Sequence, residues 1–192
     1  MSYSLNEYES LCKKAARGSG MHWGQSEEVG KAARFLGTYG LDDGRLVLRA
    51  IETFGPQNAL WLGPALCDEG CDFEEPLIMK GIEAQALMLP FLHMMVLDRN
   101  VSLCITWDRF DAIVSSGGIY CTLRDGLYED GPLDISVSKI SGSQHGVLCA
   151  QSRVNIPQDI LSRLDSLAHK TYAPSTEESR LAGAGAGLSD ND

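Results

Sequence analysis

The spacing of hydrophobic residues in the first part of the chain is three to four, which is typical of helices. This pattern predicts three helices, over residues 5–17, 23–38 and 43–54. Ser4 and Glu7 have the spacing of a capping box at the start of the first helix, and Asp42 is placed to cap the third. Gly55-Pro56 ends that third helix, because proline cannot continue the hydrogen-bond ladder. We therefore expect an N-terminal three-helix lobe over residues 1–55.

After residue 56 the hydrophobic period changes from about four to two, which is typical of half-buried strands. Apolar and polar residues alternate over residues 101–107, 110–114, 119–123, 133–137 and 147–154. Asp108-Arg109 and Gly117-Gly118 fall where tight turns would join neighbouring strands. The pattern predicts that residues 56–155 are mainly β and contain a central antiparallel β-meander.

The chain returns to helical spacing after Pro157, which suits a first helical turn. We expect a closing helix within residues 156–171, so that residues 1–171 form a single α+β domain. Residues 172–192 are rich in Gly and Ala and poor in bulky apolar residues, which predicts a flexible tail. A second interpretation is that this tail docks on a partner or folds over the N-terminal part, with Arg180 making contacts.

The composition narrows the class of protein. The chain has 192 residues and a formal net charge of −10, and it has no run of Lys or Arg of the kind that binds a phosphate backbone, so we expect no nucleic-acid partner. Its longest apolar stretch, residues 86–97, is too short to cross a bilayer, so we expect no membrane span. The absence of a secretory signal and the scattered placement of six cysteines predict a cytoplasmic location.

The richest chemistry lies in the segment 20–34, at the start of the second predicted helix. Helical spacing places Trp23, Glu27, Lys31 and Arg34 on one face, and Glu27 precedes Lys31 in the favourable ion-pair order. Together with Arg17, these residues predict a ligand- or partner-binding surface that would attract a small anionic ligand. The plain structural interpretation is that the acidic residues only stabilise the helix start.

Catalysis is the alternative, with His22 as a base and Glu27 or Glu28 as its carboxylate partner in a hydrolase or lyase. Adjacent residues on a helix do not face each other, so Glu27 and Glu28 are not assumed to form a dyad. Cys67 and Cys71 offer only one thiol pair, whereas structural zinc takes four ligands. We therefore expect no metal site and no cofactor.

Several segments together are similar to a bacterial family of unknown function. They are Ser4-Leu5-Asn6-Glu7, Lys14-Ala15-Ala16-Arg17-Gly18, Trp23-Gly24, residues 27–34 and the Gly- and Ala-rich tail. The resemblance covers nearly the whole chain and implies no reaction, cofactor or catalytic residue. The sequence thus favours a non-catalytic accessory or binding protein that contacts a protein partner, a second copy of itself or a small molecule, with a small-molecule enzyme as the alternative.

Overall fold

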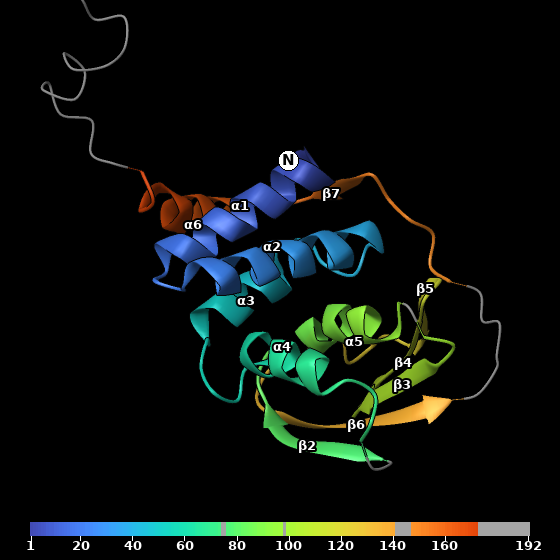
Figure 1. Cartoon of the computed structure of the whole chain (residues 1–192). Helices are drawn as coiled ribbons and strands as arrows, with labels where there is room; N and C mark the ends of the chain where they lie inside the picture. Colours follow the sequence, from blue (N-terminus) through green and yellow to red (C-terminus); the bar gives the residue numbers. More distant parts are fainter. Residues whose placement is uncertain (74–75, 98, 141–146, 173–192) are drawn as a thin grey trace, which may run out of the picture.

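A computed structural model describes residues 1–73, 76–97, 99–140 and 147–172 and shows an α+β fold. Helices from both ends of the chain lie on one side of the molecule, and an antiparallel sheet lies on the other (Figure 1). The helices are α1 (Leu5–Gly18), α2 (Trp23–Thr38), α3 (Arg45–Glu52), α4 (Ala59–Glu69), α5 (Met88–Val96) and α6 (Gln158–His169), with a 3-10 turn, η1 (Gln85–Leu87). The strands are β1 (Ser2–Ser4), β2 (Leu77–Ile82), β3 (Ser102–Trp107), β4 (Phe110–Ser115), β5 (Gly118–Leu123), β6 (Leu133–Ile140) and β7 (Arg153–Asn155).

The first two helices begin where the sequence predicts, at Leu5 and Trp23, whereas α3 begins two residues later than predicted, at Arg45. The backbone N–H of Ser4 donates to Oε2 of Glu7 at 2.7 Å, and the N–H of Glu7 donates to the Ser4 hydroxyl at 3.3 Å. This confirms the capping box. α2 has the predicted bounds, whereas α3 ends at Glu52 and leaves Phe54 beyond the helix.

Asp42 caps α3 from two residues before the N-cap, Gly44. Its Oδ1 accepts the N–H groups of Gly44 and Leu46 at 3.0 Å each, and its Oδ2 accepts that of Val47 at 3.4 Å. These bonds satisfy donors that have no partner inside the helix. The sequence prediction that Asp42 caps this helix is confirmed.

The main sheet has five antiparallel strands in the order β2-β6-β3-β4-β5. β3, β4 and β5 form the predicted meander, and Asp108-Arg109 connects Trp107 to its partner Phe110. The second turn is shifted by one residue from the prediction. Gly118 is already paired with Ser115, so the loop is Ser116-Gly117, and the backbone of Gly118 has a φ of 130°.

Residues 59–96 differ from the mainly β content that we expected. They contain α4, β2, η1 and α5, and β6 pairs with both β3 and β2 on the far side of the meander. α5 packs against β3 and β4 on one side and against α2 on the other (Figure 1). The rings of Phe35 and His93 lie 4.8 Å apart at this second contact, so α5 joins the helical part to the sheet.

The two ends of the described chain meet. β1 pairs with β7, and α1 lies against α6. The strand predicted over residues 147–154 is wrong in extent, because only Arg153–Asn155 is a strand. A three-residue strand has too little alternation to be recognised without its partner. The predicted tail falls almost entirely outside the described residues, which end at Tyr172.

α1 and α6 lie against each other at Gly18. A Cβ atom placed on Gly18 would lie 1.8 Å from the carbonyl oxygen of Leu167, closer than atoms can pack. Glycine at this position therefore allows the backbones of the two helices to touch. This contact positions α6, which carries one of the functional side chains described next.

Candidate functional site

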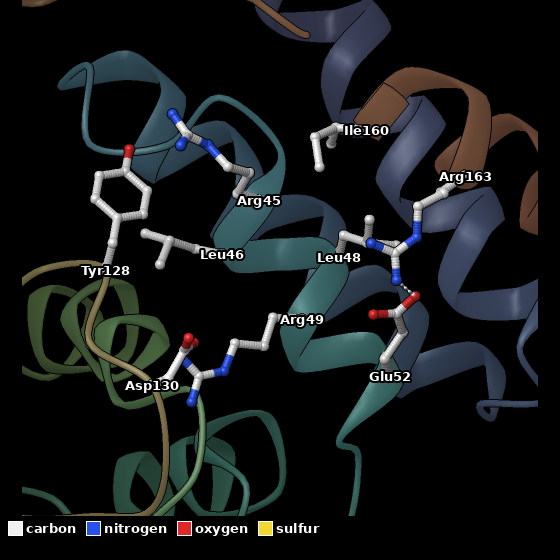
Figure 2. Close-up of a pocket in the computed structure, with 9 residues that line it drawn as sticks. All are labelled: Arg45, Leu46, Leu48, Arg49, Glu52, Tyr128, Asp130, Ile160 and Arg163. Carbon is white, nitrogen blue, oxygen red and sulfur yellow. Dashed lines mark hydrogen bonds and ion pairs between the residues drawn. The ribbon is translucent and has the colours of Figure 1, made fainter. Parts of the chain in front are cut away.

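A cavity of about 330 Å³ lies beside α3, between α6 and residues 128–130 (Figure 2). We call it the arginine cavity because three guanidinium groups from two helices line it. The other lining residues are two carboxylates, one tyrosine and three apolar side chains. The full set is Arg45, Leu46, Leu48, Arg49, Glu52, Tyr128, Asp130, Ile160 and Arg163.

Arg49 is the most enclosed of the three arginines, with 20% of its side chain exposed. Its Nη1 donates to the carbonyl oxygen of Glu129 and to Oδ1 of Asp130, both at 2.6 Å. Its Nη2 donates to the carbonyl oxygen of Gly131 at 3.3 Å and lies 3.7 Å from Oε2 of Glu83. Arg49 therefore holds the loop that forms one wall of the cavity.

Arg45 and Arg163 are more accessible. Arg45 forms a forked pair with the nearby Asp43, with contacts of 2.9 and 2.5 Å, and the hydrogen bonds to Asp43 raise the pKa of Arg45. Arg163 on α6 donates to Oε1 of Glu52 on α3 (Figure 2). The side chains of Arg163 and Glu52 are 56% and 41% exposed, and exposed ion pairs of this kind exchange partners at a cost of about 0–1 kcal/mol.

Tyr128 forms the wall opposite α6 (Figure 2). Its hydroxyl donates to the carbonyl oxygen of Leu41 at 3.2 Å, and the guanidinium carbon of Arg45 lies 5.0 Å from its ring centroid. Burial and the nearby carboxylates of Asp42 and Asp43 raise the pKa of Tyr128 to about 12. The hydroxyl is therefore protonated at neutral pH and adds no negative charge to the cavity.

A second cavity, of about 450 Å³, lies where the start of α2 meets the end of α3. We call it the tryptophan cavity, after Trp61 of α4, and its lining residues are Ser19, Gly20, Met21, His22, Gln25, Ile51, Glu52, Phe54 and Trp61. The Trp61 and Phe54 rings lie 5.8 Å apart, tilted by 54°. Glu52 lines both cavities. Of the sequence-predicted site residues, His22 alone lines this second cavity.

Two of the remaining predicted residues, Trp23 and Glu27 on α2, make contacts with α1. Lys13 of α1 donates to Oε1 of Glu27 at 2.8 Å and lies 4.7 Å from the Trp23 ring centroid. The hydrogen bond and charge of Lys13 lower the pKa of Glu27. The structure thus places Trp23 and Glu27 around a lysine that the sequence analysis did not include in the site.

The predicted pairing of Glu27 with Lys31 is replaced by another pair. Lys31 binds Oε1 of Glu28 at 2.9 Å, one helical turn earlier, and this bond raises the pKa of Lys31. The two neighbouring carboxylates therefore engage different lysines. No hydrogen bond joins either carboxylate to the His22 ring within the described ranges.

The two predicted arginines have structural contacts. Arg34 bonds to Asn6 and lies 3.2 Å from Oε2 of Glu9, which ties α2 to α1. Arg17 donates to the carbonyl oxygen of Met21 at 2.5 Å and so fixes the turn between the two helices. Neither arginine lines the two cavities described above.

The two cysteines with metal-like spacing are used in packing. Sγ of Cys67 donates to the carbonyl oxygen of Phe91 at 3.3 Å. Sγ of Cys71 lies 3.7 Å from the carbonyl oxygen of Met95. Burial raises the pKa of Cys67 to about 11, which favours the thiol over the metal-binding thiolate. Within the residues that the structure describes, no three His, Cys, Asp or Glu side chains cluster as a metal site would require.

Sequence analysis missed the arginine cavity. Arg45 and Arg49 are four residues apart on the polar side of a predicted helix, a visible but common pattern. Arg163 lies 111 residues from its partner Glu52. Only the packing of α6 against α1 and α3 brings these arginines together.

Comparison with known proteins gives one match. A family model described as a protein of unknown function (DUF3726) matches residues 3–59. This supports the resemblance to an uncharacterised family over α1 to α3, a shorter span than the nearly complete coverage that we expected. No curated protein and no solved structure matches the chain. In the part of the chain with described coordinates, each helix is too short or too polar to cross a bilayer.

Proposed function

We propose that this protein is a non-catalytic binding or accessory protein that takes a small anionic ligand in the arginine cavity. The observation that carries the proposal is the convergence of Arg45, Arg49 and Arg163 on one cavity in a chain with a net charge of −10. A negatively charged surface would otherwise repel anions, so arginines gathered at one concave place supply local attraction. Guanidinium groups also bind carboxylates and phosphates through two parallel hydrogen bonds.

Arg163 and Arg45 are the arginines that would bind the ligand. Arg163 contacts Glu52, whose side chain is 41% exposed, so an incoming anion can replace that carboxylate. Arg45 lines the cavity with a side chain that is 55% exposed, while its partner Asp43 is only 23% exposed. The Nη1 group of Arg49 already donates hydrogen bonds to the loop at residues 129–130. Arg49 therefore contributes positive charge and positions the cavity wall rather than binding the ligand directly. The start of α3 is not available to an anion, because Asp42 already accepts its N–H groups.

Calorimetric titration of the full chain with inorganic phosphate and pyrophosphate tests the proposal. Arg163→Gln should weaken binding about tenfold, the loss of about 1.4 kcal/mol that one charged hydrogen bond supplies. Glu52→Gln should have the opposite effect, because it removes the carboxylate that competes for Arg163. Arg153→Gln, at an exposed arginine outside the cavity, is the control and should bind as the wild type does.

Absence of saturable binding would remove the proposal. So would equal affinities for the Arg163→Gln variant and the wild type. A Glu52→Gln variant that binds more weakly than the wild type would also contradict it, because the ion pair would then be part of the site rather than a competitor.

Contact with a protein partner or with a second copy of the chain is a second candidate function. It is favoured by Trp23 on α2, a large apolar residue that is 61% exposed. Sedimentation velocity of the wild type and the Trp23→Ala variant tests the self-contact. The self-contact is supported if the wild type is an oligomer that the variant fails to form. It is ruled out if the wild type and the variant both sediment as monomers.

The hydrolase or lyase alternative has less support. It needs Glu27 or Glu28 as the partner of His22, and both carboxylates are engaged by lysines. We further propose a bacterial and cytoplasmic protein, on the family resemblance and the six free cysteines.

A further inference from the structure

The tryptophan cavity has the composition of a site for a planar ring. Trp61 is 49% exposed although it lies on the cavity wall, and Phe54 lies beside it. Met21 and Ile51, each 4% exposed, are apolar lining residues. Apolar and aromatic walls combined with placed polar groups are typical of small-molecule pockets. The cavity has both, since Ser19, His22, Gln25 and Glu52 also line it. Exposed ring faces favour stacking with a second ring.

Two polar side chains could recognise hydrogen-bonding atoms on such a ring. The Oε1 atom of Gln25 accepts the backbone N–H of His22 at 3.1 Å, which leaves the Gln25 amide NH₂ as a donor. The His22 side chain is exposed and lines the same cavity. These groups suit a heteroaromatic ring better than a purely hydrocarbon one.

The two cavities share a lining residue that belongs to an ion pair. Glu52 lines both, and its partner Arg163 lines the arginine cavity. Both side chains are solvent-exposed, so their separation costs little. An anionic group that binds Arg163 would take the place of Glu52 on the boundary between the cavities.

We propose that the two cavities bind one ligand, an aromatic anion whose ring stacks on Trp61 and whose phosphate or carboxylate binds Arg163. This inference rests on the proposed function and adds to it a binding site for an aromatic ring of the same ligand. The ring supplies affinity through apolar contact, and the anionic group supplies orientation. Neither half of the ligand alone should bind as well as the whole.

The test compares four probes on the full chain: inorganic phosphate, adenosine, AMP and phenyl phosphate. We expect at least one aromatic phosphate to bind about tenfold or more tightly than inorganic phosphate. Trp61→Ala should abolish this advantage and leave the affinity for inorganic phosphate unchanged. Trp61→Phe, which keeps a ring, should retain part of the advantage.

Arg163→Gln should weaken the binding of both inorganic phosphate and the aromatic phosphate. Leu123→Ala is the control, since Leu123 is an exposed apolar residue that lines neither cavity. It should bind all four probes as the wild type does.

The outcomes separate the two proposals. If phosphate binds through Arg163 but neither aromatic phosphate binds more tightly, the ring site is wrong and the anion site stands. The ring site is also wrong if the Trp61→Ala variant still binds an aromatic phosphate more tightly than inorganic phosphate, as the wild type does. If phosphate does not bind while adenosine binds in a Trp61-dependent way, both the proposed function and the single-ligand inference are overturned.

Discussion

The hydroxyl of Tyr8 on α1 donates a 2.7 Å hydrogen bond to Oδ2 of Asp42, the residue that caps α3. The two side chains are 0% and 4% exposed. A buried carboxylate needs hydrogen-bond donors, and Asp42 obtains them from one side chain and from the backbone at the start of α3. This bond therefore connects α1 to the helix that carries Arg45 and Arg49.

Tyr8→Phe should lower the free energy of unfolding by about 1–3 kcal/mol, because it leaves a buried acceptor without one of its donors. Urea denaturation measures this change. Tyr3→Phe, at a half-buried tyrosine for which no hydroxyl bond is present in the described residues, is the control and should change stability by less than about 0.5 kcal/mol. Equal effects of the two substitutions would contradict a role for the Tyr8 bond.

The pH dependence of stability should show the burial of Asp42. Burial raises its pKa above the ordinary value of 3.8, although the hydrogen bonds from Tyr8 and the α3 backbone oppose this shift. The folded state thus holds this proton to a higher pH than the unfolded state does. The stability from this group is fully present below the unfolded-state pKa and is lost as the pH rises through the folded-state pKa.

Asp42→Asn removes this titration and should retain acceptor contacts to the α3 backbone. The stability of the wild type minus that of the Asp42→Asn variant should therefore be larger at about pH 4 than at about pH 7. Urea denaturation at both values measures this difference, and other titrating groups cancel in it. A difference that grows with pH would mean that the ionised carboxylate is the favoured form.

Gly18→Ala should destabilise the protein by about 1–3 kcal/mol, because the added methyl group meets the backbone carbonyl of Leu167. Gly24→Ala is the matched control. The added Cβ at Gly24 would meet no atom within 4 Å outside its own helix backbone and chain neighbours, so this variant should be neutral or more stable, as expected for alanine in a helix. Thermal unfolding measures the stability of both variants against the wild type. A Gly18→Ala variant as stable as the wild type would refute the close helix contact.

Glu27→Gln should change stability by less than about 1 kcal/mol, because both side chains of the Lys13–Glu27 pair are partly open to solvent. Glu28→Gln should behave in the same way. Urea denaturation tests both variants. A loss of several kcal/mol in either would mean that these carboxylates do more than form surface ion pairs.

Local signals predicted part of this fold correctly. The Ser4–Glu7 capping box, the bounds of α2 and the turn at Asp108-Arg109 all depend on residues close in sequence. α4 was missed because Pro64 interrupts its sequence, and its apolar residues are not confined to one face. β1 was missed because three residues become a strand only through their partner β7.

The candidate site shows the same limit. The sequence favoured Trp23, Glu27 and Lys31 because helical spacing puts them on one face of a helix. The structure places them in surface contacts. The arginine cavity depends on α6, which is far from α3 in the sequence but packs against it in the fold. No local pattern could indicate that Arg163 pairs with Glu52.

The most direct test of the central claim is a phosphate titration of the full chain followed through the Nε–Hε NMR signals of its arginines. We predict that the signals of Arg45 and Arg163 shift with a common saturation curve, while that of Arg153 stays unchanged. Shifts confined to Arg17 and Arg34 would place the anion at the sequence-predicted surface instead. That result, or the absence of any saturable shift at Arg163, would contradict an anion site in the arginine cavity.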